Sequence, residues 1–177
     1  MPARQPLLSS ASLPLIWIVS DARNDAVLEQ TLARLPRGSG LIFRHYHLGP
    51  EARAKRFAEL ARVARRFGHC VVLSGTAREA RRWGTDAAYG APASGRSLAT
   101  VHSLRELATA HRTGARAVLL SPVFPTRSHP GGKVLGTLRF RLIAMRARVP
   151  VIALGGMTER HARHLGAARW AAIDGLS

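Results

Sequence analysis

The chain is poor in cysteine, lysine, acidic residues and long apolar runs. Of its 177 residues, Cys70 is the only cysteine. It cannot form an internal disulfide, and because it lies in the apolar run "HCVVL" we expect a buried, unreactive thiol. No segment approaches the roughly 20 apolar residues of a membrane span. The opening "MPARQPLLSSASLP" lacks the apolar core of a signal peptide. We therefore expect a soluble, cytoplasmic protein.

Acidic residues are outnumbered by basic ones, 10 against 27, which gives a net charge of +17. Such a charge can indicate nucleic-acid binding, attraction of phosphorylated substrates, or a biased composition. The basic residues, all arginine except Lys55 and Lys133, are scattered over helix-like stretches without a DNA-binding motif or a basic tail. Aromatic residues, which would stack on bases, make up only 6%. Nucleic acid is therefore not an expected partner, and most arginines are interpreted as solvated helix faces.

Strand-like and helix-like segments alternate along the chain. A hydrophobic content of 46% is ordinary for a globular protein, and we expect a single domain over 1–177. Eight strands are expected, at 15–21, 40–48, 69–75, 85–91, 97–103, 115–124, 149–156 and 169–177. Helical patterns follow most of them, one around 137–147, although the fourth connection lacks one and no eighth helix follows the last strand.

This alternation implies parallel strands, because each crossover must return over one face of the sheet. Eight units predict a compact closed (β/α)8 TIM barrel with trimmed helices. The alternative is an open doubly wound sheet, but no G-x-G-x-x-G or Walker loop follows the first strand.

Two glycines end the seventh expected strand, in "ALGGMT" at 153–158. Without Cβ atoms, such a turn lets backbone N–H groups approach a phosphate. In barrels, phosphates bind at the loops after strands seven and eight. Gly155, Gly156, Gly175 and Ser177 are therefore predicted to bind one, with an ordinary tight turn as the alternative.

The loop "SPVFPTRSHPGGK" at 121–133 follows the sixth expected strand. Thr126, Arg127, Ser128 and His129 offer hydroxyl, guanidinium and imidazole groups, which suit a second anionic group. The alternative is a polar surface loop stiffened by proline.

Arg44 lies in the second expected strand, within "LIFRHYH". Alternation with a period of two places Ile42, Arg44 and Tyr46 on one face. We expect Arg44 to point into the barrel mouth, and the alternative is an exposed position at a strand edge.

The segments "ARAVLLSPVFPTRS", "VPVIALGGMT" and "ATVHS" together resemble the thiamine phosphate synthase and thiazole tautomerase superfamily. The resemblance covers 97–177 and, more faintly, 15–48. It implies a (β/α)8 enzyme of thiamine biosynthesis, a transferase that joins a hydroxymethylpyrimidine diphosphate to a thiazole phosphate with release of pyrophosphate and with help from Mg²⁺.

The resemblance also assigns residues. Arg44 stands at the position of the family's strand arginine and Thr100 near the expected diphosphate, so both are candidate catalytic residues. Thr126 and Ser128 match the two hydroxyls of the loop, and the glycine pair of "ALGGMT" matches the phosphate-binding turn. A histidine corresponding to His102 is common in the family, and a structural or packed role is expected for it.

Several positions depart from the family pattern. Ile42, Tyr46 and His129 replace a glutamine and two lysines, while Pro122 is synthase-like where the tautomerase has a histidine. "LSG" at 73–75 and "YGAPAS" stand where the family has its two magnesium carboxylates. Mg²⁺ is thus expected from the family, but no metal ligand is predicted here.

We expect Arg44, Arg127 and Lys133 to neutralise a diphosphate instead. The alternative function is a catalytically degenerate or tautomerase-like barrel that binds a phosphorylated thiamine precursor. The expected partners are phosphorylated small molecules, with a homodimer left open.

Overall fold

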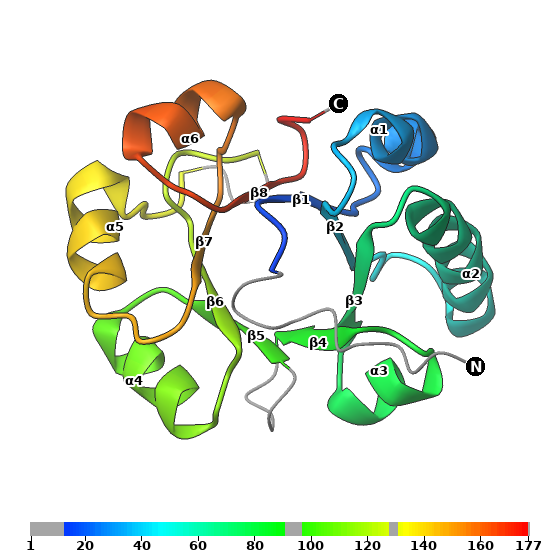
Figure 1. Ribbon diagram of the computed structural model, residues 1–177, viewed down its shortest axis with the longest axis horizontal. Helices are drawn as coiled ribbons and strands as arrows, with labels where there is room; N and C mark the ends of the chain where they lie inside the picture. The colour runs from blue at the N-terminus through cyan, green and yellow to red at the C-terminus, as the bar shows by residue number, and fades with distance from the viewer. Residues whose placement is uncertain (1–12, 91–96, 128–130, 177) are drawn as a thin grey trace.

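A computed structural model describes residues 13–90, 97–127 and 131–176. Its eight strands form a closed, all-parallel barrel in sequence order, with the last strand paired to the first (Figure 1). The strands are β1 Ile16–Val19, β2 Gly40–Phe43, β3 Cys70–Gly75, β4 Ala87–Gly90, β5 Ser97–Val101, β6 Ala117–Leu120, β7 Val151–Leu154 and β8 Trp170–Ala172. The predicted (β/α)8 barrel is confirmed.

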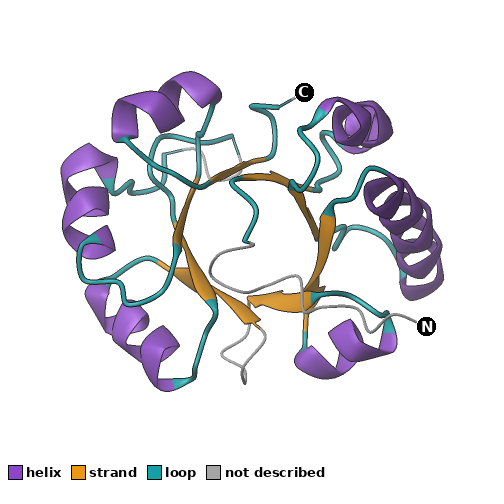
Figure 2. Ribbon diagram, in the orientation of Figure 1, coloured by secondary structure: helices purple, strands orange, loops and turns teal. Residues whose placement is uncertain are grey.

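Helices surround the ring of strands on its outer side (Figure 2). They are α1 Leu28–Arg34, preceded by a short 3-10 helix at Asp25–Val27, then α2 Pro50–Arg66, α3 Ala77–Arg82, α4 Leu104–Arg112, α5 Gly136–Ala144 and α6 Glu159–Leu165. With six α-helices in the described ranges, the barrel has the trimmed helical layer that the sequence predicts. The fourth connection, 91–96, lies outside the described residues.

The strands alternate between a barrel interior and a helix-facing layer. In β3, Cys70 and Val72 pack inside the barrel with Trp17 and Ile42, whereas Val71 packs toward the helices. This is the period-two pattern of a strand that is buried on both faces. Burial strongly raises the pKa of the Cys70 thiol, so the expected buried, protonated cysteine is found.

The second strand is shorter than predicted and ends at Phe43 rather than near residue 48. The Arg44 N–H group bonds to the Ser20 side chain, and His45 adopts a positive φ of 36°. Both features end the regular strand, because a non-glycine residue at positive φ cannot continue an extended conformation.

Among the described residues, no helix is both long and apolar enough to cross a bilayer.

Gly40 begins β2 directly opposite Trp17 of β1. A Cβ atom at Gly40 would lie 2.1 Å from the Trp17 ring, and that buried ring is fixed by a 2.9 Å hydrogen bond from its Nε1 to the Pro14 carbonyl. We predict that Gly40→Ala lowers the free energy of unfolding by about 3 kcal/mol, because overpacking forces a core side chain or the backbone to move. Urea denaturation measures this loss.

Gly49 supplies the matched control. It has ordinary backbone geometry and nothing within 4 Å of its added Cβ, so Gly49→Ala should cost less than about 1 kcal/mol. Equal losses for the two variants would contradict the steric explanation.

Candidate active site

A cavity of about 810 Å³ opens at the carboxyl ends of the strands. Seven of the ten predicted site residues line it, namely Arg44, Thr100, Thr126, Arg127, Gly155, Gly156 and Gly175. The other three, Ser128, His129 and Ser177, lie outside the described residues. Residues from all parts of the chain therefore meet at one rim.

The basic side chains of this cavity come from two strands on opposite sides of the barrel. Arg44 follows β2, whereas Arg127 and Lys133 follow β6. In a closed ring of eight strands, β2 and β6 lie opposite each other. The cavity therefore has two cationic walls that face one another, and Arg44 lines its mouth as the alternation of β2 predicted.

Neutral hydrogen-bonding groups line the wall between these cations, on β3 to β5. The Tyr89 hydroxyl is hydrogen-bonded to Thr100, and burial raises the pKa of Tyr89. The Tyr46 hydroxyl bonds to the Ser74 hydroxyl. These phenols and hydroxyls can donate hydrogen bonds to oxygen atoms of a ligand.

His102 also lines the cavity, where it is exposed rather than packed into the core. Its Nδ1 atom lies 2.6 Å from the Ser121 carbonyl oxygen. Because a carbonyl only accepts, Nδ1 carries a proton in this contact. His102 is thus not packed into the core, but its contact with Ser121 agrees with the structural role that was expected as the other possibility.

The predicted phosphate-binding glycines are required by packing between loops. A Cβ on Gly155 would lie 2.7 Å from Pro122 Cα, and one on Gly156 would lie 2.4 Å from the Pro125 carbonyl oxygen. Both glycines also have a positive φ. The β7 turn is thus locked against the β6 loop that carries Thr126 and Arg127. This contact explains the glycines without a ligand, and phosphate binding at the turn stays a prediction.

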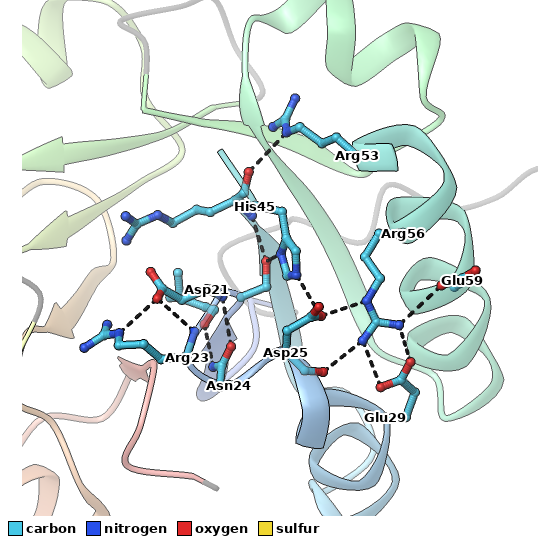
Figure 3. Close-up of polar contacts among 12 residues, drawn as sticks. Asp21, Arg23, Asn24, Asp25, Glu29, His45, Arg53, Arg56 and Glu59 are labelled. Carbon is cyan, nitrogen blue, oxygen red and sulfur yellow. Dashed lines mark hydrogen bonds and ion pairs between the residues drawn. The ribbon is translucent and has the colours of Figure 1, made fainter. Parts of the chain in front are cut away.

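A polar chain, buried at Ser20 and His45, lies behind Arg44 and was not predicted. Ser20 Oγ is 2.8 Å from His45 Nδ1, His45 Nε2 is 2.8 Å from Asp25 Oδ1, and Asp25 Oδ1 accepts from Arg56 Nε at 2.7 Å. Figure 3 shows His45, Asp25 and Arg56 in this order. The chain ends at Arg44, whose backbone N–H donates to Ser20 Oγ at 2.8 Å.

This arrangement of serine, histidine and aspartate is not that of a hydrolase. Ser20 is fully buried and is not among the residues that line the cavity, so a substrate cannot reach it. Its hydroxyl already accepts the Arg44 N–H group, while Arg53 Nε donates to the Arg44 carbonyl at 3.1 Å. The polar chain therefore fixes the backbone that carries the Arg44 side chain.

The pKa values support this structural role. Burial lowers the pKa of His45 below 6.5, although the Asp25 carboxylate opposes the shift. Partial burial acts to raise the pKa of Asp25, but hydrogen bonds from His45 and Arg56 hold it below the ordinary value. His45 is thus neutral near pH 7, with Nε2–H directed to Asp25 and Nδ1 accepting from Ser20.

Sequence reasoning missed this chain because its members are far apart and polar residues after strands are common. Two features of the sequence could have indicated it, namely His45 directly after Arg44 and Ser20 at the end of the first strand.

The residues at the cavity do not fit a Mg²⁺ site. Asp174 is the one carboxylate among the described residues that line it, and Arg23 Nη1 lies 3.2 Å from that carboxylate. Hard divalent cations prefer several oxygen ligands. No group of three or more potential metal ligands occurs within the described ranges.

Comparison with known proteins relates the chain to thiamine phosphate synthases. The family model for thiamine monophosphate synthase matches residues 98–176. A putative thiamine-phosphate synthase 2 of Aquifex aeolicus is 37% identical over 59 residues, 33% of this chain and 32% of that protein. Thiamine-phosphate synthase of Pyrococcus furiosus is 34% identical over 67 residues, 38% of this chain and 32% of that protein. The alignments thus span about a third of either relative.

Solved structures show the same fold. Thiamine phosphate pyrophosphorylase from Pyrococcus furiosus has a TM-score of 0.75 at 20% identity, covering 91% of this chain and 85% of that one. FabK from Thermotoga maritima has a TM-score of 0.58 at 17% identity, covering 98% of this chain and 62% of that one. At these identities the structural likeness shows the fold alone. The resemblance to the synthase superfamily is confirmed by the sequence matches.

The buried chain behind Arg44 predicts a pH-dependent stability. An unfolded histidine takes up a proton near pH 6.5, whereas His45 in the folded protein does so only at lower pH. The unfolded state therefore binds more protons in this window, and the free energy of unfolding should fall as the pH drops from 7 to about 5. His45→Gln should remove part of this slope and cost about 1–3 kcal/mol at pH 8.

Exposed His164 of α6 is the matched control, because it takes no part in the polar chain behind Arg44. His164→Gln should leave both the stability at pH 8 and the slope unchanged in urea denaturation series between pH 5 and pH 8. Identical slopes for wild type and His45→Gln would show that His45 does not titrate as proposed.

Proposed function

We propose that this chain, whose residues 98–176 match the family model for thiamine monophosphate synthase, is a transferase of thiamine biosynthesis. It joins a hydroxymethylpyrimidine diphosphate to a thiazole phosphate and releases pyrophosphate. The finding that carries this proposal is the pair of cationic walls, Arg44 on one side and Arg127 with Lys133 on the other, at the rim where barrel enzymes act.

Two opposed cationic walls suit two phosphorylated ligands held in one cavity. A volume of about 810 Å³ lies within the usual range of roughly 300–1,000 Å³ for small-molecule sites. Arginine recognises phosphate oxygens with two parallel hydrogen bonds, and its charge persists at all working pH values. The Tyr89–Thr100 pair lies on the wall between the cations and can orient a ring by hydrogen bonds.

The proposed step forms one bond and breaks another. The lone pair of the thiazole nitrogen forms a C–N bond to the pyrimidine methylene carbon. The C–O bond to the diphosphate breaks, and its electron pair leaves with pyrophosphate. Positive charge remains on the thiazole ring, while negative charge grows on the leaving group. Arg44, Arg127 and Lys133 stabilise that leaving group, because fixed cations act most strongly where charge develops.

The runner-up function is a barrel that binds a phosphorylated thiamine precursor without turnover. The poor fit of the cavity to Mg²⁺ favours it. Incubating purified protein with both substrates, with and without Mg²⁺, separates the two functions. Formation of thiamine phosphate and pyrophosphate supports the transferase, whereas saturable binding of the thiazole phosphate without product supports the runner-up.

We predict that turnover depends more on Arg127 than on metal. Arg127→Ala should lower the rate by about a hundredfold, as removal of one charge-stabilising donor commonly does, while a chelator should change it by less than about tenfold. Rates of pyrophosphate release measure both effects.

Arg105 on the outer helix α4 supplies the control for lost positive charge. It is exposed and not among the cavity residues, so Arg105→Ala should keep the rate within about twofold. Complete loss of activity in chelator that Mg²⁺ restores would overturn the metal-independent account.

A further inference from the structure

Asp174 is the single carboxylate among the described residues that line the cavity. It follows β8, which lies between β7 and β1 in the closed ring. Its position is therefore on the wall between the two cationic walls, opposite β4 with its Tyr89 phenol. The Asp174 side chain is 40% exposed, so a ligand in the cavity can reach it.

The negative charge of Asp174 is only partly neutralised. Arg23 Nη1 lies 3.2 Å from Asp174 Oδ2, while Arg23 Nε lies 2.9 Å from Asp21 Oδ1. Figure 3 shows the contact between Arg23 and Asp21. Partial burial acts to raise the pKa of Asp21, but hydrogen bonds and charge from Arg23 hold it below its ordinary value. Two carboxylates thus share the Arg23 guanidinium, and the charge of Arg44 also acts on Asp21.

A carboxylate at this place is unfavourable for a purely anionic ligand. It is favourable for a ligand whose phosphate groups contact the cationic walls while a positive charge lies between them. We propose that Asp174 is a specificity-determining residue that selects a positively charged ring joined to a phosphate over a neutral ring joined to a phosphate. This inference rests on the proposed function, in which positive charge forms on the thiazole ring between the two phosphate-binding walls.

The charge at Asp174 has a direct energetic consequence for such ligands. Opposite charges a few ångströms apart attract at the edge of a protein cavity, and the attraction is weakened by solvent and by a competing partner such as Arg23. Replacing the carboxylate with an amide of the same shape removes this attraction and leaves the packing in place. The affinity for a cationic ring should fall about tenfold, whereas the affinity for a neutral ring should stay the same or rise.

Asp174→Asn tests the inference with three probes at one ionic strength, measured by calorimetry. The probes are thiamine phosphate, whose thiazolium ring is cationic, the thiazole phosphate, whose ring is neutral, and inorganic pyrophosphate. We expect about tenfold weaker binding of thiamine phosphate, unchanged binding of the thiazole phosphate within twofold, and equal or tighter binding of pyrophosphate. Asp174→Ala should give the same ratios if the amide variant folds poorly.

Glu51→Gln on the outer helix α2 is the matched control, because it removes an exposed carboxylate that does not line the cavity. It should leave the ratio of the thiamine phosphate affinity to the thiazole phosphate affinity unchanged within twofold. If Asp174→Asn weakens both esters equally, or if Glu51→Gln shifts the ratio as strongly, the specificity role is overturned while the proposed function stands. If the wild-type protein binds none of the three probes, the proposed function is overturned, and this inference with it.

Discussion

The closure of the parallel barrel is the constraint on which the rest of the structure depends. The last strand pairs with the first, Trp170 beside Ile16, and this pairing sends every carboxyl end to the same rim. Side chains more than a hundred residues apart thereby face one cavity, such as Arg44 and Asp174. Inside the barrel, the Trp17 ring of β1 lies against the start of β2 and leaves room only for a glycine at position 40.

The rim is stiffened from two directions. On one side, the β6 loop and the β7 turn meet through glycines that pack against Pro122 and Pro125. On the other side, a chain of hydrogen bonds reaches from the Arg44 backbone through buried Ser20 and His45 to Arg56, which pairs with the partly exposed Glu29 and Glu59. A polar network holds one geometry when each member has a partner. The backbone that carries Arg44, Thr126 and Arg127 is therefore held in place by these contacts.

The charged groups at the cavity are arranged differently from those of a metal site. Fixed guanidinium and ammonium groups lie on opposite walls, and the carboxylate between them is shared with Arg23. Such groups need less strict geometry than Mg²⁺ demands of its ligands. The arginines have two different locations. Most of them lie on the outer helices, while Arg44 and Arg127 line the cavity.

The sequence by itself determined the alternation of eight strands with helices, and hence the barrel, because period-two burial and helical patterns are local properties. It also predicted that Arg44, Thr100 and the glycine pair lie at one rim, where they line the cavity, since strand ends in this fold share that rim. Only the tertiary structure decided why Gly155 and Gly156 are glycines, where His102 points, and that Ser20, Asp25 and His45 join behind Arg44. Those outcomes depend on contacts between distant loops, and such contacts leave no periodic trace in the order of the residues.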